Sequence, residues 1–384
     1  MDCKELRRKV IKKYFSEMND MQFEAVTAVN GPVLVLAGAG SGKTTVLVNR
    51  IANLVKFGDG YNSDYSRELT EQEVKWGEDY INGAADYVPN GVFSVSPVNP
   101  WNILAITFTN KAAGELKERI SAKITDGGED IWAGTFHSVC GKILRRYADR
   151  LGFTSHFTIY DTDDQRRLMK EIMRAKNIDD KILPHKSVLS CISSAKDELV
   201  NPAEYKKDAG SDMRKQTIAE LYRIYQKRLK DADAMDFDDM IVKTVELLRE
   251  NPDVHDYYKA KFRYVMVDEY QDTNHAQYVL VSLLAAGLNN ICVVGDDDQS
   301  IYRFRGATIE NILSFEDEFK GAKVIRLEQN YRSTSNILNA ANAVIRNNRA
   351  RKGKNLWTNS GNGDEIEVYT AEDERGEARY VAES

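Results

Sequence analysis

The chain has 384 residues, of which 42% are hydrophobic and 29% charged, and its formal net charge is −6. That length and apolar content are enough for a buried core and predict two or three domains. No apolar run is long enough to cross a bilayer, the charged N-terminus has no signal-peptide pattern, and the four scattered cysteines form no metal-binding pair. We therefore expect a cytoplasmic protein without membrane contact.

Short apolar runs recur along the chain, and each ends in a polar or glycine-rich turn. They span 33–36, 103–108, 264–267, 291–295 and 324–327. Such runs are typical of strands that are buried on both faces of a parallel sheet. Because helical patterns follow most of them, the sequence predicts an α/β doubly wound domain.

Two segments interrupt this alternation. Residues 58–100 are rich in Gly, Asn, Asp and Tyr and hold eight acidic and two basic residues, so the rest of the chain is balanced in charge. A connection of this length is usually functional or disordered, but its aromatic residues argue against a purely flexible loop. Residues 150–233 are charged and helical in pattern and predict a helical insert.

The stretch AGAGSGKTT after the first apolar run has the composition of a phosphate-binding loop. It consists of Ala37, Gly38, Ala39, Gly40, Ser41, Gly42, Lys43, Thr44 and Thr45. Small residues let backbone N–H groups and a helix N-terminus converge on the phosphates of ATP. We expect Lys43 to reach the β and γ phosphates and Thr44 to place its hydroxyl on Mg²⁺. The alternative, a glycine-rich turn without a ligand, is disfavoured by the strand–loop–helix context.

Two carboxylates, Asp268 and Glu269, directly follow the run at 264–267. We expect Asp268 to bind the Mg²⁺ ion through its water shell and Glu269 to orient and deprotonate the attacking water. An Asp-Glu pair after a strand is more often an ordinary turn or helix cap. Together with the lysine loop, it predicts a nucleotide-hydrolysing site.

Several further stretches define the class of protein. In chain order they are ITFTNKAA (106–113), GTFHSVC (134–140), MDFDD (235–239), VVGDDDQSIYRFRGA (293–307), LEQNYRST (327–334) and NLWT (355–358). With the phosphate loop and DEYQD, they closely resemble the superfamily-one DNA helicases of the UvrD/PcrA/Rep type. The resemblance runs from residues 18–26 to 355–358 and implies a P-loop NTPase (RecA-like) fold.

The resemblance assigns further residues to the ATP site. Gln22 would read the adenine edge, Arg50 would flank the base, and Tyr331 would stack on the ring. Gln299 would sense the γ-phosphate, and Arg332 would reach it from a second motor domain and stabilise the transition state. Without the resemblance, a lone Gln or Arg is usually a solvated surface residue, and a lone Tyr is more often in the core.

Three strand-end loops are candidates for binding single-stranded DNA, which needs flat side chains for stacking and donors for phosphates. They contain Thr107, Phe108, Thr109 and Asn110; Thr135, Phe136, His137 and Ser138; and Tyr302, Phe304 and Arg305. On pattern alone, core packing is the favoured role of Phe108 and Phe136. The family usually has Trp where Phe304 stands. His137 lacks a partner at metal-ligand spacing, so we interpret it as a phosphate or hydrogen-bonding contact, and we interpret the acids of MDFDD as structural.

The resemblance also implies a domain organisation. We expect a first motor domain from 1–149 and 234–328, a helical insert domain at 150–233, and the start of a second motor domain at 329–384. Residues 58–100 are a family-atypical insertion, which we expect to be an ordered elaboration away from the DNA, with a possible protein partner. Because the later family motifs are absent, we expect this chain to bind ATP weakly, to hydrolyse it poorly and not to unwind DNA.

For the parent protein, the sequence predicts an ATP- and Mg²⁺-dependent 3′–5′ helicase acting on single-stranded DNA and duplex junctions, in DNA repair or replication. A nuclease domain beyond the end of the chain is a further option, because relatives of this motor drive nuclease complexes. Two alternatives from other classes stay open. One is a non-catalytic DNA- or protein-binding module, and the other is a P-loop enzyme with a small-molecule substrate.

Overall fold

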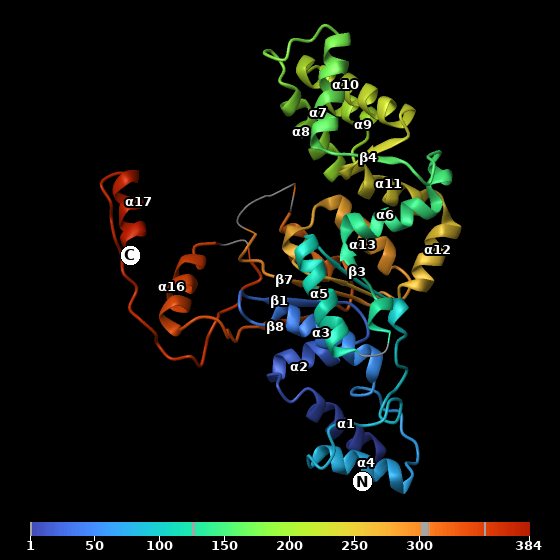
Figure 1. The fold of residues 1–384 in the computed structure, drawn as a ribbon, viewed down its shortest axis with the longest axis vertical. Helices are drawn as coiled ribbons and strands as arrows, with labels where there is room; N and C mark the ends of the chain where they lie inside the picture. The colour runs from blue at the N-terminus through green and yellow to red at the C-terminus, as the bar shows by residue number, and fades with distance from the viewer. Residues whose placement is uncertain (1, 125–126, 301–305, 307, 349–350) are drawn as a thin grey trace.

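A computed structural model describes residues 2–124, 127–300, 306, 308–348 and 351–384. Its centre is a six-stranded sheet in the order β3-β2-β6-β7-β1-β8, and every pairing is parallel (Figure 1). The strands are β1 (Val33–Ala37), β2 (Ile103–Thr107), β3 (Trp132–Thr135), β6 (Tyr264–Val267), β7 (Ile291–Gly295) and β8 (Lys323–Leu327). The α/β doubly wound prediction is therefore confirmed. Within the described residues, no helix has the length and apolarity to span a membrane.

Helices cover both faces of the sheet, because side chains alternate along each buried strand. Val33 and Val35 of β1 pack into one core with α2 (Asp20–Thr27), α3 (Lys43–Lys56) and α5 (Asn110–Lys123). Leu34 and Leu36 pack into the other core with α6 (Phe136–Tyr147), α11 (Phe237–Glu250) and α13 (His275–Ala285). The remaining helices around the sheet are α12 (Pro252–Lys261), α14 (Glu310–Leu313) and α15 (Phe315–Glu318). Because the strands are parallel, the loops that follow them leave the same edge of this two-sided core.

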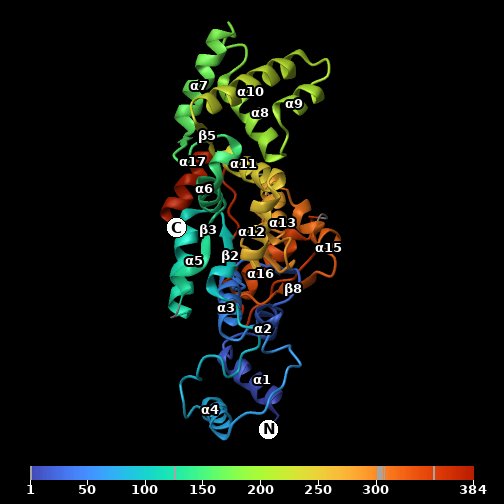
Figure 2. The same cartoon turned by 90° about the vertical axis from the view of Figure 1, so that its right-hand side faces the viewer.

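The segment 150–233 folds as a helical unit with its own core, at one end of the molecule (Figures 1 and 2). Its helices are α7 (Thr162–Ala175), α8 (His185–Asp197), α9 (Pro202–Asp208) and α10 (Met213–Asp231). No strong strand was expected here, but β4 (Thr158–Tyr160) pairs in parallel with β5 (Ala234–Asp236). The chain therefore enters and leaves the insert through adjacent strands.

The segment 58–100 is ordered and contains a helix, α4 (Glu71–Ile81), which begins with a capping box formed by Thr70 and Glu73. The helix packs against α1 (Cys3–Tyr14) at the opposite end from the insert (Figures 1 and 2). The buried guanidinium of Arg7 donates to the carbonyls of Gly60, Ser63 and Tyr65. This network of hydrogen bonds fixes the loop before α4 and explains why the segment is not a free linker.

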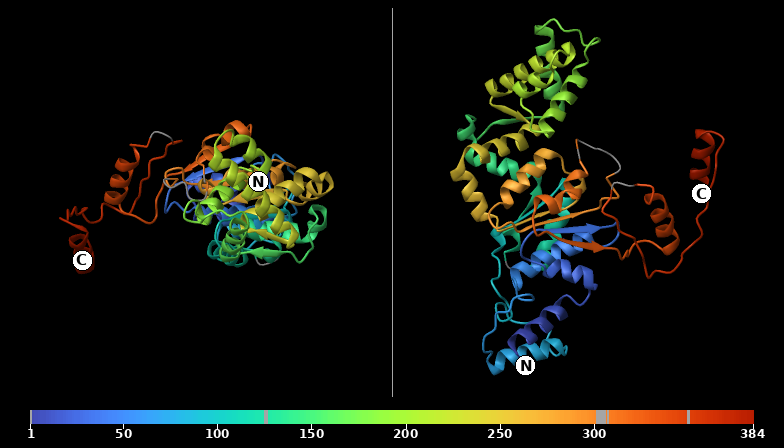
Figure 3. Two further views of the ribbon diagram at one scale, coloured as in Figure 1. Left: turned by 90° about the horizontal axis from the view of Figure 1, so that it is seen from above. Right: turned by 180° about the vertical axis from the view of Figure 1, so that it is seen from behind.

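Beyond β8 the chain leaves the sheet and projects to one side, with α16 (Ser335–Ile345) and α17 (Glu374–Glu383) (Figures 1 and 3). Residues 329–332 and 351–357 return to the carboxyl edge of the sheet through the hydrogen bonds described below. This segment therefore adds residues to the site formed by the strand ends.

Candidate functional site

The phosphate loop joins the end of β1 to α3 and is shaped by two glycines in the left-handed region, Gly40 (φ 73°) and Gly42 (φ 86°). Gly42 is the N-cap of α3 and provides no capping side chain, so no such group competes for the first amides of the helix. An uncapped helix N-terminus binds anions, because its free N–H groups and its dipole both favour negative charge. The local structure is therefore suited to hold phosphates.

Lys43, the first residue of α3, contacts a carboxylate from another strand end. Its Nζ lies 2.6 Å from Oε2 of Glu269, which follows β6. Glu269 has φ 52° and ψ 44°, an unusual conformation for a residue with a Cβ that costs on the order of 1 kcal/mol. The Nε2 of Gln271 donates to the same Oε2 at 2.8 Å. These contacts hold the strained Glu269 in front of the phosphate loop.

Asp268 ends the same strand and has a different environment. It is 7% exposed, and its Oδ1 accepts a hydrogen bond from the backbone N–H of Glu269 at 3.0 Å. Burial, followed by the charge of Glu269, raises the pKa of Asp268 to about 6. A buried carboxylate without full compensation is suited to a divalent cation, and Mg²⁺ prefers such oxygen ligands. The chemistry of Asp268 therefore fits the predicted metal, while Thr44 lies in the first turn of α3 and its part in that site stays a prediction.

Gln22 lies against the phosphate loop, and its predicted contact with the adenine stays a prediction. Its Nε2 donates to the carbonyl of Ser41 at 3.0 Å, and its Oε1 accepts from the backbone N–H of Asn19. A Cβ at Gly42 would lie 2.8 Å from Gln22 Nε2, so glycine at 42 makes room for this amide. Asn19, which was not predicted as a site residue, lies three residues before Gln22 and forms a capping box with it.

Residues 330–332 also contact the phosphate loop. The Nδ2 of Asn330 donates to the carbonyl of Ala39 at 2.6 Å. The backbone N–H of Tyr331 donates to the carbonyl of Gly40 at 2.9 Å. Asn19 Nδ2 donates to the Tyr331 hydroxyl at 2.9 Å, while the Tyr331 side chain as a whole is exposed. The structure thus brings Tyr331 close to α2, the helix that carries Gln22.

Arg332 is exposed and is next to the loop, because a Cβ at Gly40 would lie 2.7 Å from the Cβ of Arg332. Glycine at 40 is therefore required by its φ and also by the close approach of this segment. Asn330, which was not predicted, holds the turn, since its Oδ1 accepts from the backbone N–H groups of Arg332 and Ser333. Its signal in the sequence is a polar residue directly before the Tyr-Arg pair.

Gln299 is linked to the carboxylates by a chain of hydrogen bonds. Its Nε2 donates to Oδ2 of Asp296 at 2.5 Å, and the backbone N–H of Asp296 donates to Oε1 of Gln271 at 2.9 Å. Gln271 is 2% exposed and in turn contacts Glu269. Gln271, which was not predicted, therefore connects the ends of β6 and β7. It links Glu269, the predicted general base, to Gln299, the predicted γ-phosphate sensor.

The structure gives Arg50 a packing role, which argues against the predicted contact with the base. Its side chain is 1% exposed and donates to the carbonyls of Ala25 and Val29, at the end of α2 and just after it. Both hydrogen bonds hold the guanidinium inside the fold. Arg50 instead joins α3 to the segment that carries Gln22, and the sequence could not distinguish these roles because both place an arginine on the first helix.

The predicted DNA loops after β2 and β3 are adjacent, since Thr107 and Thr135 are paired in the parallel register. The side chains of Thr109 and Thr135 cap α5 and α6, so two helix N-termini begin at the same edge of the sheet. Thr109 and Asn110 are exposed. This edge therefore offers donors to phosphates in the way that helix N-termini do.

Three predicted DNA contacts are corrected by burial. Thr107, Thr135 and Phe136 are 2%, 6% and 2% exposed, and Phe136 belongs to the core under α6. Phe108 is partly buried, with its ring 5.3 Å from that of Phe136. The core-packing alternative therefore holds for Phe136.

His137 is partly buried and its ring lies 5.5 Å from that of Phe237, while Ser138 is exposed. Tyr302, Phe304 and Arg305 lie outside the described residues. The third predicted DNA loop stays a prediction.

The acids of MDFDD have the structural role that we expected. Asp236 caps α11, and Nζ of the buried Lys196 lies 2.7 Å from Asp236 Oδ2 and 2.8 Å from Asp239 Oδ1. Lys196 is in α8, so this ion pair connects the helical insert to the first residues after it. Buried charges require such pairing.

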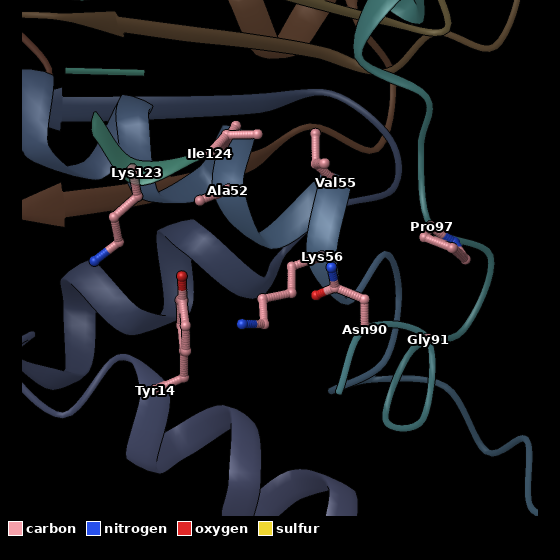
Figure 4. A pocket seen from close by; sticks show the side chains of 9 residues that line it. All are labelled: Tyr14, Ala52, Val55, Lys56, Asn90, Gly91, Pro97, Lys123 and Ile124. Carbon is pink, nitrogen blue, oxygen red and sulfur yellow. The ribbon is translucent and has the colours of Figure 1, made fainter. Parts of the chain in front are cut away.

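A cavity of about 260 Å³ lies away from these residues, between α1, α3, the end of α5 and residues 90–97 (Figure 4). Lys56 and Lys123 project toward the Tyr14 ring there, with their Nζ atoms 4.6 and 5.3 Å from its centroid. Burial, followed by the charge of Lys123, lowers the pKa of Lys56. None of the predicted site residues lines this cavity.

Comparisons with known proteins agree with this geometry. Residues 18–63 and 92–320 match the UvrD/REP helicase N-terminal domain, and residues 325–384 match the UvrD-like helicase C-terminal domain. Over 373 residues, the chain is 47% identical to the ATP-dependent DNA helicase PcrA of Bacillus subtilis (strain 168). The matched region makes up 97% of this chain and 45% of that protein. The protein of the same name from Staphylococcus aureus (strain Mu50) is 48% identical over 366 residues, or 95% of this chain and 45% of the relative.

The chain therefore spans less than half the length of these relatives. The unmatched residues between 63 and 92 fall inside the segment 58–100, which contains α4. The six-stranded parallel sheet, flanked by helices, is consistent with a RecA-like helicase fold. Taken with the phosphate loop and the carboxylates that face it, these matches show that the chain belongs to the UvrD/REP helicase family.

Proposed function

We propose that this chain is the ATP-binding portion of an ATP-dependent 3′–5′ DNA helicase that acts on single-stranded DNA and duplex junctions. The observation that carries the proposal is the contact between Lys43 and Glu269, 2.6 Å apart across two strand ends, beside the buried Asp268. A lysine for phosphates and a carboxylate pair for a metal and a water are the parts that nucleotide hydrolysis needs.

In this proposal the nucleotide rearranges the site. ATP phosphates compete with Glu269 for Lys43, so that binding frees the Glu269 carboxylate to accept a proton from water. Thr44 and Asp268 would hold the Mg²⁺ ion, which would neutralise charge on the phosphates. Gln22 and Tyr331 bind the base, and Arg332 stabilises charge on the γ-phosphate. Catalysis thus needs both the phosphate loop and the segment 330–332.

DNA binding is assigned to the edge of the sheet at the ends of β2 and β3. We propose that Thr109, Asn110 and His137 contact phosphates near the N-termini of α5 and α6, and that the partly buried Phe108 presents its remaining surface to a base. The loop at 301–305 would add Tyr302, Phe304 and Arg305.

The family relationship also supports a role in DNA repair or replication. We propose that this chain alone binds ATP weakly, hydrolyses it poorly and does not unwind DNA. The segment 58–100 presents the exposed aromatic residues Tyr65, Trp76 and Tyr87 together with an acidic surface. We propose that this surface faces a protein partner rather than DNA, because its charge repels phosphates.

The test is the ATPase rate with and without single-stranded DNA, for this chain and for a version extended to the full length of its relatives. We expect the extended protein to hydrolyse ATP and DNA to accelerate it, and Lys43→Met to abolish both. If DNA leaves the rate of the extended protein unchanged, the strand-end loops are packing elements and the small-substrate alternative is favoured. If neither protein binds ATP, the non-catalytic alternative is favoured.

A further inference from the structure

Lys354 lies in the segment after α16, yet its side chain is buried at the end of β7. Its Nζ is 2.6 Å from a carboxylate oxygen of Asp296, 2.6 Å from one of Asp297 and 2.8 Å from one of Asp298. The side chain of Lys354 is fully buried, and Asp296 and Asp297 are 2% and 1% exposed. One ammonium is therefore shared by three successive carboxylates.

The three carboxylates are close enough together to hold a metal ion, but the position between them is taken by this lysine. The backbone N–H of Lys352 donates to Asp297, and the guanidinium of Arg351 lies 2.8 Å from Asp298. Burial alone would lower the pKa of Lys354, but Asp296 and the hydrogen bonds to all three carboxylates raise it. The acidic run is thus compensated by residues 351–354 and is not a metal site.

Asp296 connects this cluster to the nucleotide site. Its carboxylate accepts from the amide of Gln299, and its backbone N–H donates to Gln271, which contacts Glu269. Two residues after Lys354, the Leu356 side chain packs so closely on Gly38 that a Cβ there would clash with it. The segment 354–356 therefore contacts both the acidic run and the phosphate loop.

We propose that Lys354 is a positioning residue, which ties Gln299 and Gln271 to the segment after β8 so that movement of this segment on nucleotide binding is passed to the end of β7. This inference rests on the proposed function, because it assumes that Gln299 senses the nucleotide. The alternative is a purely structural role, in which Lys354 only stabilises the fold. The two differ in whether the response to nucleotide is lost while the affinity for nucleotide is kept.

The experiment compares hydrogen exchange of residues 293–300 in the wild-type chain, Lys354→Met and Lys323→Met, with and without Mg-ATPγS. Lys323 is the matched control, because it also forms an ion pair, with Glu24 at 2.7 Å, but does not touch the acidic run. In Lys354→Met, we expect residues 293–300 to exchange at least tenfold faster than in the wild type, and Mg-ATPγS not to slow this exchange. The Kd of Lys354→Met for a fluorescent ATP analogue should change less than threefold. Lys354→Arg, which keeps the charge, should restore part of the response.

The inference is overturned if Lys354→Met keeps the nucleotide response of the wild type, or if its exchange matches that of Lys323→Met. If Lys354→Met does not fold, Asp298→Asn replaces it, since this weakens the cluster at its most exposed acid. The same loss of response is then expected, and an intact response refutes the inference. If the wild-type chain binds no nucleotide, the proposed function fails, while exchange without nucleotide still shows whether Lys354 holds the acidic run.

Discussion

Replacing Asp268 by Asn should stabilise the protein in the absence of metal and nucleotide, although it removes the proposed metal ligand. The pKa of Asp268 rises from 3.8 in the unfolded chain to about 6 in the folded chain. The folded state therefore binds the proton more tightly, so the stability of the wild type falls as pH rises from about 4 to about 6. At 1.36 kcal/mol for each pKa unit, this loss is about 3 kcal/mol. An uncharged Asn does not incur it.

The Asn variant forfeits part of the hydrogen bond to the Glu269 N–H and buries a new amide, at a cost of about 1 kcal/mol. We therefore expect Asp268→Asn to be about 2 kcal/mol more stable than the wild type at pH 7.5 in EDTA, with the gain gone near pH 4.5. Urea unfolding followed by circular dichroism measures this difference. The exposed Asp256→Asn is the control and should show no gain.

Mg²⁺ together with nucleotide should reverse the order of stability of the wild type and Asp268→Asn. With Mg-ATPγS, the wild type gains stability in proportion to the bound ligand, whereas Asp268→Asn gains less. A variant that is less stable than the wild type at pH 7.5 without metal would refute the reasoning, because it would mean that the Asp268 charge is already compensated in the fold.

Four other substitutions test separate parts of the structure. Lys43→Met should abolish binding of a fluorescent ATP analogue but change the free energy of unfolding by less than about 1 kcal/mol, because its ion pair is partly exposed. Phe136→Ala should lower the free energy of unfolding in urea by about 3–5 kcal/mol. Asn110→Ala should leave the stability unchanged and weaken the binding of labelled single-stranded DNA. Equal stabilities of these two variants would contradict the assignment of Phe136 to the core. Lys196→Met leaves the buried Asp236 without its counter-ion and should cost about 3–5 kcal/mol, and a neutral result would show that water reaches this cluster.

The strands and the phosphate loop were predictable because their signals are local. The five apolar runs correspond to β1, β2, β6, β7 and β8, each within about one residue of the observed bounds. The missed β3 has the sequence WAGT, in which small residues give no apolar run. The helix at 71–81 was also missed, since its stability comes from its cap and its packing on α1 rather than from a long apolar stripe.

The sequence by itself determined the chemistry of this protein: a lysine loop, a carboxylate pair and the motif order of one helicase family. Those features depend on residue type and spacing, which the sequence displays directly. Only the tertiary structure decided which side chains are accessible, and it buried Arg50, Thr107 and Phe136. It also decided which residues distant in sequence meet, as Lys354 meets Asp296. Burial and ion pairing across long separations depend on how helices pack on the sheet, and no local pattern contains that information.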